Sequence, residues 1–246
     1  MNKKEVFENY VTTQYADGNI TKMRTGYAKM MKLTLPELNS LPKGARILEL
    51  GFGVGGFTQL CKEMGFTDYT GVDLSLQEVH LCREDFPDYK FVNDEVINYL
   101  QNNAGAYDVI LMSQVFEHLT LQEGEEFLKL IPRHLTPEGM FINSMPNANG
   151  YYNSPSNRYN DITHKIIYNA QSFSQLLRVL GFTNFLHKNS YQGRNKLENF
   201  IHRIYLKFFQ VHLTLLGYHV WKIYSHSLIT IIKHNDSQKL NWDQKL

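Results

Sequence analysis

The stretch ILELGFGVGGF, residues 47–57, indicates the fold class of this chain. Its apolar first half is typical of a buried strand and runs directly into Gly51, Gly53 and Gly55. A helical pattern, FTQLCKEMG, follows the glycines, so backbone amides at a helix N-terminus can approach a bound ligand closely. A strand, a glycine turn and a helix in this order are typical of nucleotide-binding α/β folds.

Strand and helix patterns alternate on both sides of this stretch, which is the signature of a parallel sheet with crossover helices. Further strands are expected at YTGVDLS, at 89–92, at 107–112 and at 140–144, and helices at LQEVHLCRED and at about 124–131. Another helix is expected at about 172–180, with Ser172 and Gln175 as its capping box. The β-branched run HSLITIIKH, 226–234, predicts a strand that closes the sheet.

The expected organisation is one globular domain with additions at both ends. Residues 1–44 form a helical preamble, residues 45–183 form the sheet core, and residues 184–246 form a basic aromatic helical insertion plus the closing strand. A length of 246 residues suits this arrangement. The 25 Lys and Arg residues nearly balance the 24 Asp and Glu residues, so a protein that generally coats nucleic acid is excluded.

Cysteine usage and the N-terminus bear on the compartment. Two cysteines, Cys61 and Cys82, cannot form a disulfide framework, and both lie on expected helix faces as core residues. No apolar segment follows the first lysines, so no secretory signal is expected. Cytoplasmic localisation is the expectation.

Three features narrow the ligand of the glycine turn. Phe57 and Thr58 stand where a phosphate-binding P-loop needs Lys and Ser or Thr. Glu49 would repel a pyrophosphate but suits a ligand with a cationic centre. Asp73 ends the next strand, where a carboxylate can accept hydrogen bonds from both hydroxyls of a ribose. The ligand expected is a cationic ribonucleoside without phosphates.

These residues resemble those of the class I S-adenosylmethionine (SAM)-dependent methyltransferases. Glu49 and the three glycines match the first motif of that family, and Asp73, followed by Leu74, matches the second. Asp94, next to Glu95, is similar to the acidic residue near the adenine amine, with a surface helix cap as the alternative. Ser113 and VFEHL, 115–119, resemble the fourth motif. The resemblance implies a Rossmann-like, mostly parallel seven-stranded sheet whose last strand is antiparallel, with SAM as methyl donor.

The acceptor side is expected around two histidines at the carboxyl edge of the sheet. His118 and His164 are candidate general bases, and Asp161 could orient His164. Each histidine could instead order a loop, and His118 could touch the cofactor. No ligand spacing for a metal is visible, so no metal is expected, although His118, His164 and Asp161 are conceivable ligands.

The segment 158–182, beginning RYNDITHK, is similar to methyltransferases of bacterial surface polysaccharide synthesis, including O-antigen and capsule. That resemblance implies a sugar acceptor, nucleotide-linked or phosphorylated, bound by Arg158, Tyr159 and His164. A surface salt bridge is the alternative for Arg158. N-methylation of a small amine or phosphoamine and a non-catalytic SAM-binding scaffold remain as alternative functions. Nucleic acid is not expected as a partner, since no Asn-Pro-Pro-aromatic motif follows the fourth strand.

The segment 184–234 carries seven Lys and Arg residues against a single acid, Glu198. Between 197 and 215 its apolar residues follow a helical stripe flanked by basic residues. Through residues 194–225 this segment could lie on a membrane surface, pack on the sheet as an acceptor lid, or form a homodimer contact. The run between Lys207 and Lys222 has 14 residues without a charged side chain, which is too short to cross a bilayer.

Overall fold

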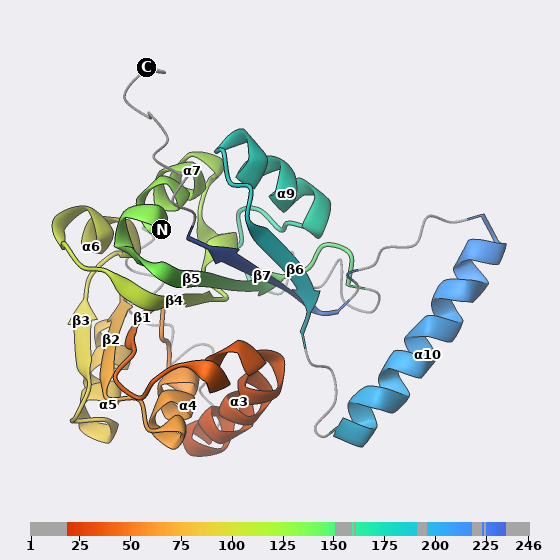
Figure 1. Cartoon of the computed structure of the whole chain (residues 1–246). Helices are drawn as coiled ribbons and strands as arrows, with labels where there is room; N and C mark the ends of the chain where they lie inside the picture. Colours follow the sequence, from red (N-terminus) through yellow and green to blue (C-terminus); the bar gives the residue numbers. More distant parts are fainter. Residues whose placement is uncertain are drawn as a thin grey trace.

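The computed structural model describes residues 19–150, 159, 161–190, 196–217, 223 and 225–234. In these residues the chain forms one seven-stranded sheet with helices on both faces (Figure 1). The strands are β1 (Arg46–Leu50), β2 (Asp68–Asp73), β3 (Lys90–Asn93), β4 (Tyr107–Ser113), β5 (Leu135–Pro146), β6 (Phe185–Asn189) and β7 (Ser227–Lys233).

The strand order is β3-β2-β1-β4-β5-β7-β6. Strand β1 pairs in parallel with β2 and with β4, and Glu49 lies opposite Gly71 on one side and Leu111 on the other. Strand β7 runs antiparallel to both β5 and β6. This order confirms the expected class I methyltransferase architecture. The chain reverses its direction of progress between β1 and β4, and a ligand crevice forms at such a switch point.

Helices cover the two faces of the sheet in separate sets (Figure 1). One set is α3 (Ile20–Thr34), α4 (Gly56–Met64) and α5 (Leu76–Asp85). The other is α6 (Val96–Asn102), α7 (Leu121–Leu130) and α9 (Ala170–Val179). Short 3-10 turns are η1 (Pro36–Ser40), η2 (Phe116–His118) and η3 (Ile131–His134).

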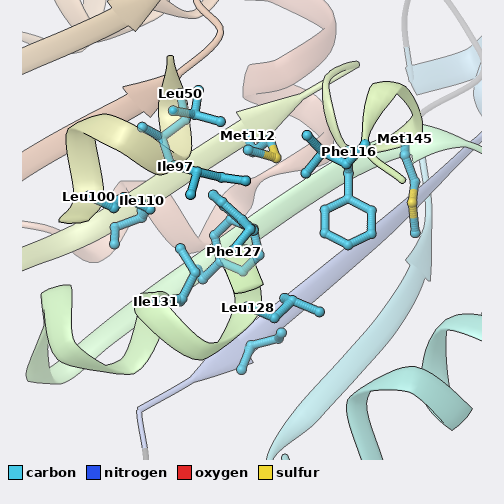
Figure 2. Close-up of a cluster of buried hydrophobic side chains, with 14 of the residues drawn as sticks. Leu50, Ile97, Leu100, Ile110, Met112, Phe116, Phe127, Leu128, Ile131 and Met145 are labelled. Carbon is cyan, nitrogen blue, oxygen red and sulfur yellow. The ribbon is translucent and has the colours of Figure 1, made fainter. Parts of the chain in front are cut away.

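The core is divided by the sheet because side chains of a strand alternate between its faces. In β1, Ile47 packs in the cluster under α3, α4 and α5, whereas Leu48 and Leu50 pack in the cluster under α6, α7 and α9. Figure 2 shows part of the second cluster, where Phe127 of α7 lies over apolar side chains of the strands. Because both faces are covered, the central strands read as continuous apolar runs in the sequence. Cys61 and Cys82 are free and buried, as expected of core residues.

Two helices begin earlier than the sequence pattern indicated. Helix α9 starts at Ala170, and its capping box joins Asn169 and Ser172, so the expected box of Ser172 with Gln175 is wrong. Helix α7 starts at Leu121 after a capping box of Thr120 and Glu123. In both cases the capping side chain stands before a polar first turn, which the apolar periodicity does not mark.

The segments on either side of the expected core contribute further elements. Helix α3 precedes the core in sequence, and β6, α10 (Lys196–Leu215) and β7 follow it. Within 1–44 the structure describes α3 and η1, and residues 1–18 lie outside the described residues. The expected closing strand is β7, and β6 beside it was not anticipated, because its sequence FLHKN has a half-exposed, polar pattern. Helix α10 lies between these two strands in sequence.

Helix α10 stands away from the sheet and its covering helices (Figure 1). Its apolar stripe is exposed, with Phe208 at 74% and Ile204 at 55% of their full accessibility, whereas Leu206 on another side is buried. The structure therefore does not place the stripe on the sheet as a lid. Within the described part of the chain, no helix combines the length and apolarity that crossing a bilayer requires.

Candidate active site

A cavity of about 280 Å³ opens at the carboxyl ends of β1, β2 and β4. Its walls come from the glycine turn, from the ends of these strands, and from α3. The lining residues are Met23, Arg24, Tyr27, Glu49, Gly51, Phe52, Gly53, Val54, Gly56, Phe57, Asp73, Leu74, Glu78, Glu95, Val96, Ser113, Gln114, Val115, His118 and Leu119. This is the place where open α/β sheets bind ligands.

The glycine turn needs glycine for its backbone conformation. Gly51, Gly53 and Gly55 have φ values of 78°, 53° and 87°, in the left-handed region that side chains disfavour. A Cβ atom on Gly51 would also lie 2.2 Å from Val115 Cγ2. Gly51 and Gly53 line the cavity, and Gly55 is the N-cap from which α4 begins. The turn thus brings backbone against the cavity at the start of a helix, as the sequence predicts.

Asp73 ends β2 and is held by backbone amides. Its Oδ2 accepts from Gly53 N at 3.0 Å, and its Oδ1 accepts from Ser75 N at 2.9 Å. Burial raises the pKa of Asp73, and these amides oppose the rise. Leu74 also lines the cavity, next to the carboxylate. The two amides favour the ionised form of Asp73, and its role in binding a ribose stays a prediction.

Glu78 in α5 is a cavity residue that the sequence patterns did not mark. Its carboxyl group hydrogen-bonds to Asp73, and burial followed by the charge of Asp73 raises its pKa to about 9. Because the backbone amides favour the ionised form of Asp73, the shared proton resides on Glu78. Glu78 Oε1 is buried with no hydrogen-bond partner among the described residues. The only sequence signal was its position one helical turn after the capping Ser75.

Glu49 of β1 is buried at the floor of the cavity. Its Oε2 accepts hydrogen bonds from the hydroxyls of Tyr69 and Thr58. Burial raises the pKa of Glu49 from 4.5 to about 8, against the effect of the two hydroxyls. A cationic ligand would favour the ionised carboxylate, so the electrostatics suit a sulfonium or ammonium group.

Glu95 and Val96, at the start of α6, form another part of the cavity wall. The Asp94 carboxylate accepts from Glu95 N at 2.8 Å and from Asn98 Nδ2 at 2.7 Å. Asp94 itself is not among the lining residues, and the N-cap of α6 is Glu95, so both roles weighed for Asp94 from the sequence stay predictions. Ser113, at the end of β4, lines the cavity and hydrogen-bonds through Oγ to Tyr27 OH at 2.5 Å.

Helix α3 closes one side of the cavity, a role that the sequence did not indicate. Arg24 donates from Nε to Val54 O in the glycine turn and from Nη1 to Asp85 at 2.5 Å. The Tyr27 ring packs so closely on Gly56 that a Cβ there would lie 2.6 Å from it. The sequence pattern of 20–34 predicts a helix, but it does not predict that this helix packs on the glycine turn. An apolar stripe on a helix does not specify the surface that it packs against.

The two expected histidines come together beside the cavity. His118 lines the cavity in η2 and its ring centroid lies 4.9 Å from that of His164. Two backbone hydrogen bonds attach the segment that follows His164 to η2. Lys165 N and Ile166 N donate to Glu117 O, at 2.7 Å and 3.3 Å. Just before η2, Gln114 adopts a φ of 57°, a strained value for a non-glycine residue and one found at functional sites.

The Asp161 carboxylate is linked to His118 through Thr163, and the backbone O of Asp161 accepts from His164 N at 3.3 Å. Thr163 Oγ1 donates to Asp161 Oδ1 at 2.5 Å and lies 2.7 Å from His118 Nδ1. Because the single hydroxyl proton goes to Asp161, Thr163 Oγ1 accepts from the Nδ1–H of His118. Nε2 of His118 is therefore the unprotonated, basic nitrogen.

Glu117 is a further polar residue that sequence reasoning did not single out. Its side chain is 1% exposed, and neither carboxylate oxygen has a partner among the described residues. Burial raises the pKa of Glu117 to about 8, opposed by its own backbone N–H and helped by the charge of Asp161. One ligand atom each of Glu117, His118 and His164 lies within 4.8 Å of the others.

The expected sugar-binding residues are only partly described. Arg158 lies outside the described residues. Tyr159 is 79% exposed and is not among the residues that line the cavity. His164 stands beside His118 but does not itself line the cavity.

Known proteins similar to this chain are methyltransferases. A family described as "Methyltransferase domain" matches residues 21–187. An uncharacterized methyltransferase of Oceanobacillus iheyensis is 24% identical over 140 residues, covering 56% of this chain and 64% of that protein. The chain thus spans less than two thirds of the length of this curated relative.

Solved structures share the fold at low identity. A SAM-dependent methyltransferase from Archaeoglobus fulgidus has a TM-score of 0.63 and 22% identity, covering 94% of this chain and 100% of that one. The 1,6-didemethyltoxoflavin-N1-methyltransferase of Burkholderia thailandensis, bound to S-adenosylhomocysteine, has a TM-score of 0.60 and 17% identity, covering 94% and 88%. With the strand order, the glycine turn and the family match in agreement, the chain belongs to the class I SAM-dependent methyltransferases.

Proposed function

We propose that this protein transfers the methyl group of SAM to a hydroxyl group of a small sugar derivative. The observation that carries the proposal is the chain of hydrogen bonds Asp161–Thr163–His118, which leaves a basic Nε2 on a residue that lines the cavity. A sugar hydroxyl is too weakly acidic to attack unaided, so a positioned base is what this chemistry needs.

The cavity divides the work of transfer between its two ends. Asp73, Glu49 and the glycine turn hold the cofactor, and orientation of the reactants supplies much of the rate. The acceptor oxygen forms a bond to the methyl carbon while the carbon–sulfur bond breaks, and the electron pair remains on sulfur in S-adenosylhomocysteine. The hydroxyl proton passes to Nε2 of His118.

A sugar acceptor is supported by the resemblance of segment 158–182 to methyltransferases of bacterial surface polysaccharide synthesis. On that resemblance, Arg158 and Tyr159 bind a phosphorylated or nucleotide-linked sugar next to His164, and the product enters a surface glycan. Arginine suits this role because its planar fork binds phosphate oxygens in a bidentate manner.

The test is to incubate the protein with SAM and a panel of nucleotide sugars, sugar phosphates and small phosphoamines. Mass spectrometry then detects products heavier by one methylene group. Methylated sugars support the proposal, and a methylated amine as the only product would establish the alternative of N-methylation. Calorimetry with SAM addresses the scaffold alternative, because a scaffold without a working pocket gives no binding heat.

Variants of the histidines test the base. His118→Ala is expected to lower kcat by about 10²- to 10⁴-fold with the affinity for SAM unchanged. His80→Ala is the matched control, since His80 is exposed on α5 away from the cavity. If His118→Ala and His164→Ala both keep the kcat/KM of the unaltered enzyme, the assignment of a histidine base is wrong.

We also propose that the exposed stripe of α10 is a homodimer contact. A helix of 20 residues is about 30 Å long, enough for a seam with a second copy. The α10 sequence carries three cations, Lys196, Arg203 and Lys207, against one acid, Glu198. A net charge of +2 over 20 residues is a weaker basic face than membrane-surface helices carry.

The oligomeric state tests this contact. The double variant Ile204→Asp, Phe208→Asp is expected to convert a dimer to a monomer in light scattering, whereas Thr214→Asp, off the stripe, should not. A monomeric unaltered protein would overturn the proposal. Cosedimentation with anionic vesicles that the double variant abolishes would replace the dimer with a membrane contact.

A further inference from the structure

We propose that Glu117, His118 and His164 form a binding site for one divalent transition-metal ion at the acceptor end of the cavity. One carboxylate and two imidazoles converge there, and the three ligand atoms lie within 4.8 Å of one another. No ligand spacing is visible in the sequence, because two ligands are adjacent in η2 and the third comes from a segment that only the fold brings beside it.

The backbone holds this constellation together. Lys165 N and Ile166 N both donate to Glu117 O, so the residue that follows His164 is attached directly to the turn that carries the other two ligands. Bonds of about 2.1 Å to a metal place ligand atoms roughly 3.0 to 3.4 Å apart, so the cation would draw these atoms inward by at most about 1.8 Å. Side-chain rotation supplies movements of this size.

The Glu117 carboxylate is the strongest sign that this place suits a cation. It is 1% exposed, and neither oxygen has a hydrogen-bond partner among the described residues. Burying a carboxylate without a partner is costly, and buried charges in proteins are paired or coordinate metals. Neither ion pair found among the described residues involves Glu117.

His118 is oriented as a metal-binding histidine. Its Nδ1–H donates to Thr163 Oγ1, which in turn donates to Asp161, so the ring is fixed and Nε2 carries the lone pair. Metal-binding histidines usually donate their second nitrogen to such a partner, which fixes the tautomer and raises the basicity of the ligand.

The ligand set indicates the class of ion. One carboxylate with two imidazoles is the set of catalytic zinc sites and of non-haem iron(II) sites, whereas Mg²⁺ prefers oxygen ligands throughout. Such sites keep positions open for water or substrate. His118 lines the cavity, so open positions on that side would meet the acceptor.

This inference rests on the proposed function in one respect. A cation there would hold the acceptor hydroxyl and lower its pKa, which replaces direct proton removal by His118. Thr163 and Asp161 then act as positioning residues for a ligand rather than for a base.

Metal binding by untagged protein, freed of metal by chelator and without SAM or acceptor, tests the site. Titration with Zn²⁺, Mn²⁺ and Mg²⁺ by calorimetry is expected to show one site per chain for Zn²⁺ or Mn²⁺ and much weaker binding of Mg²⁺. Glu117→Gln and His164→Ala should each weaken binding by about 10- to 100-fold or more. Glu126→Gln and His80→Ala, exposed matched controls, should bind as the unaltered protein does.

Two further readouts keep the test decisive. Binding of S-adenosylhomocysteine shows that each variant is folded, and Zn²⁺ should raise the Tm of the unaltered protein but not that of Glu117→Gln. No uptake by folded unaltered protein, or uptake that survives both ligand substitutions, overturns the site.

Failure of the proposed function gives a different pattern. If the metal binds but no sugar is methylated, the site stands and the acceptor assignment falls. If metal-free protein methylates a sugar at the full rate, the acceptor assignment stands and the site has no part in it.

Discussion

At the scale of single residues, the glycine turn is determined by backbone conformation and by space. Gly51 combines a φ of 78° with a contact in which a Cβ would lie 2.2 Å from Val115 Cγ2. Both penalties affect the cavity wall, because Gly51 and Val115 are adjacent and both line the cavity. A side chain at position 51 would therefore alter both the turn and the shape of the cavity.

Gly51→Ala is expected to lower the free energy of unfolding by about 1–3 kcal/mol and to abolish measurable SAM binding. Gly26→Ala is the control: Gly26 lies within α3 with nothing within 4 Å of an added Cβ, so helix propensity should raise stability by up to about 1 kcal/mol. Denaturant unfolding and calorimetry measure the two effects. Equal effects of both substitutions would contradict the steric argument.

Glu49 predicts a pH dependence of SAM binding. Its pKa of about 8 in the free protein means that it is protonated at neutral pH, and a cationic ligand favours the ionised form. Below pH 8 binding must release this proton, so SAM affinity should rise with pH, by at most about tenfold per unit, and level off above pH 8. Calorimetry of Glu49→Gln should give weaker binding with a flatter profile. An affinity of the unaltered protein that is the same at pH 6 and pH 8 would refute this role.

At the scale of elements, α3 matters because it is bonded to the glycine turn. Arg24 is buried, donates to Val54 O and Asp85, and its guanidinium lies 5.1 Å from the Phe86 ring centroid. The helix therefore supports the turn from outside, although it precedes the sheet core in sequence.

Arg24→Met is expected to lower the free energy of unfolding by about 1–3 kcal/mol, because it leaves the Val54 carbonyl without its donor. The affinity for SAM should fall together with the free energy of unfolding, since Val54 lines the cavity. Lys29→Met, exposed on the same helix, is the control and should change neither quantity. Unchanged SAM binding in folded Arg24→Met would separate α3 from the site.

Elements also show where prediction from the sequence succeeded. The central strands and α4 were placed because buried apolar runs and glycines have local signatures. The start of α9 at Ala170 was missed because Asn169, its cap, precedes the apolar face. Strand β6 was missed because pairing with β7 at the sheet edge, and not its own pattern, makes it a strand.

At the scale of the whole molecule, the buried acids of the cavity make stability depend on pH. Glu49 and Glu78 have pKa values of about 8 and about 9 in the folded protein, against 4.5 ordinarily. The folded state therefore holds protons that the unfolded state releases. Their stabilisation is complete below about pH 4.5 and is lost as pH rises through 8 to 9, by at most about 1.4 kcal/mol per unit for each group.

The ligand-free protein is accordingly expected to have a lower Tm at pH 9 than at pH 6.5. Glu78→Gln should reduce this difference, since a glutamine needs no proton to remain buried, whereas Glu126→Gln on the surface should not. Thermal unfolding at pH 6.5 and pH 9 measures the difference in Tm for each protein. A difference that Glu78→Gln leaves intact would show that this carboxyl does not carry the shared proton.

The amino-acid pattern was sufficient to predict the strand, glycine turn and helix that line the cavity, with Glu49 and Asp73 at strand ends. These features depend on local φ angles and on residue periodicity. Tertiary structure alone decided that α3 covers the cavity, that Glu117 and His118 meet His164, and that α10 stands apart with its apolar stripe exposed. Such contacts join segments far apart in the chain. These contacts depend on which surfaces pack together. An apolar periodicity in the sequence shows that a helix or strand has a face to bury, but not which element buries it.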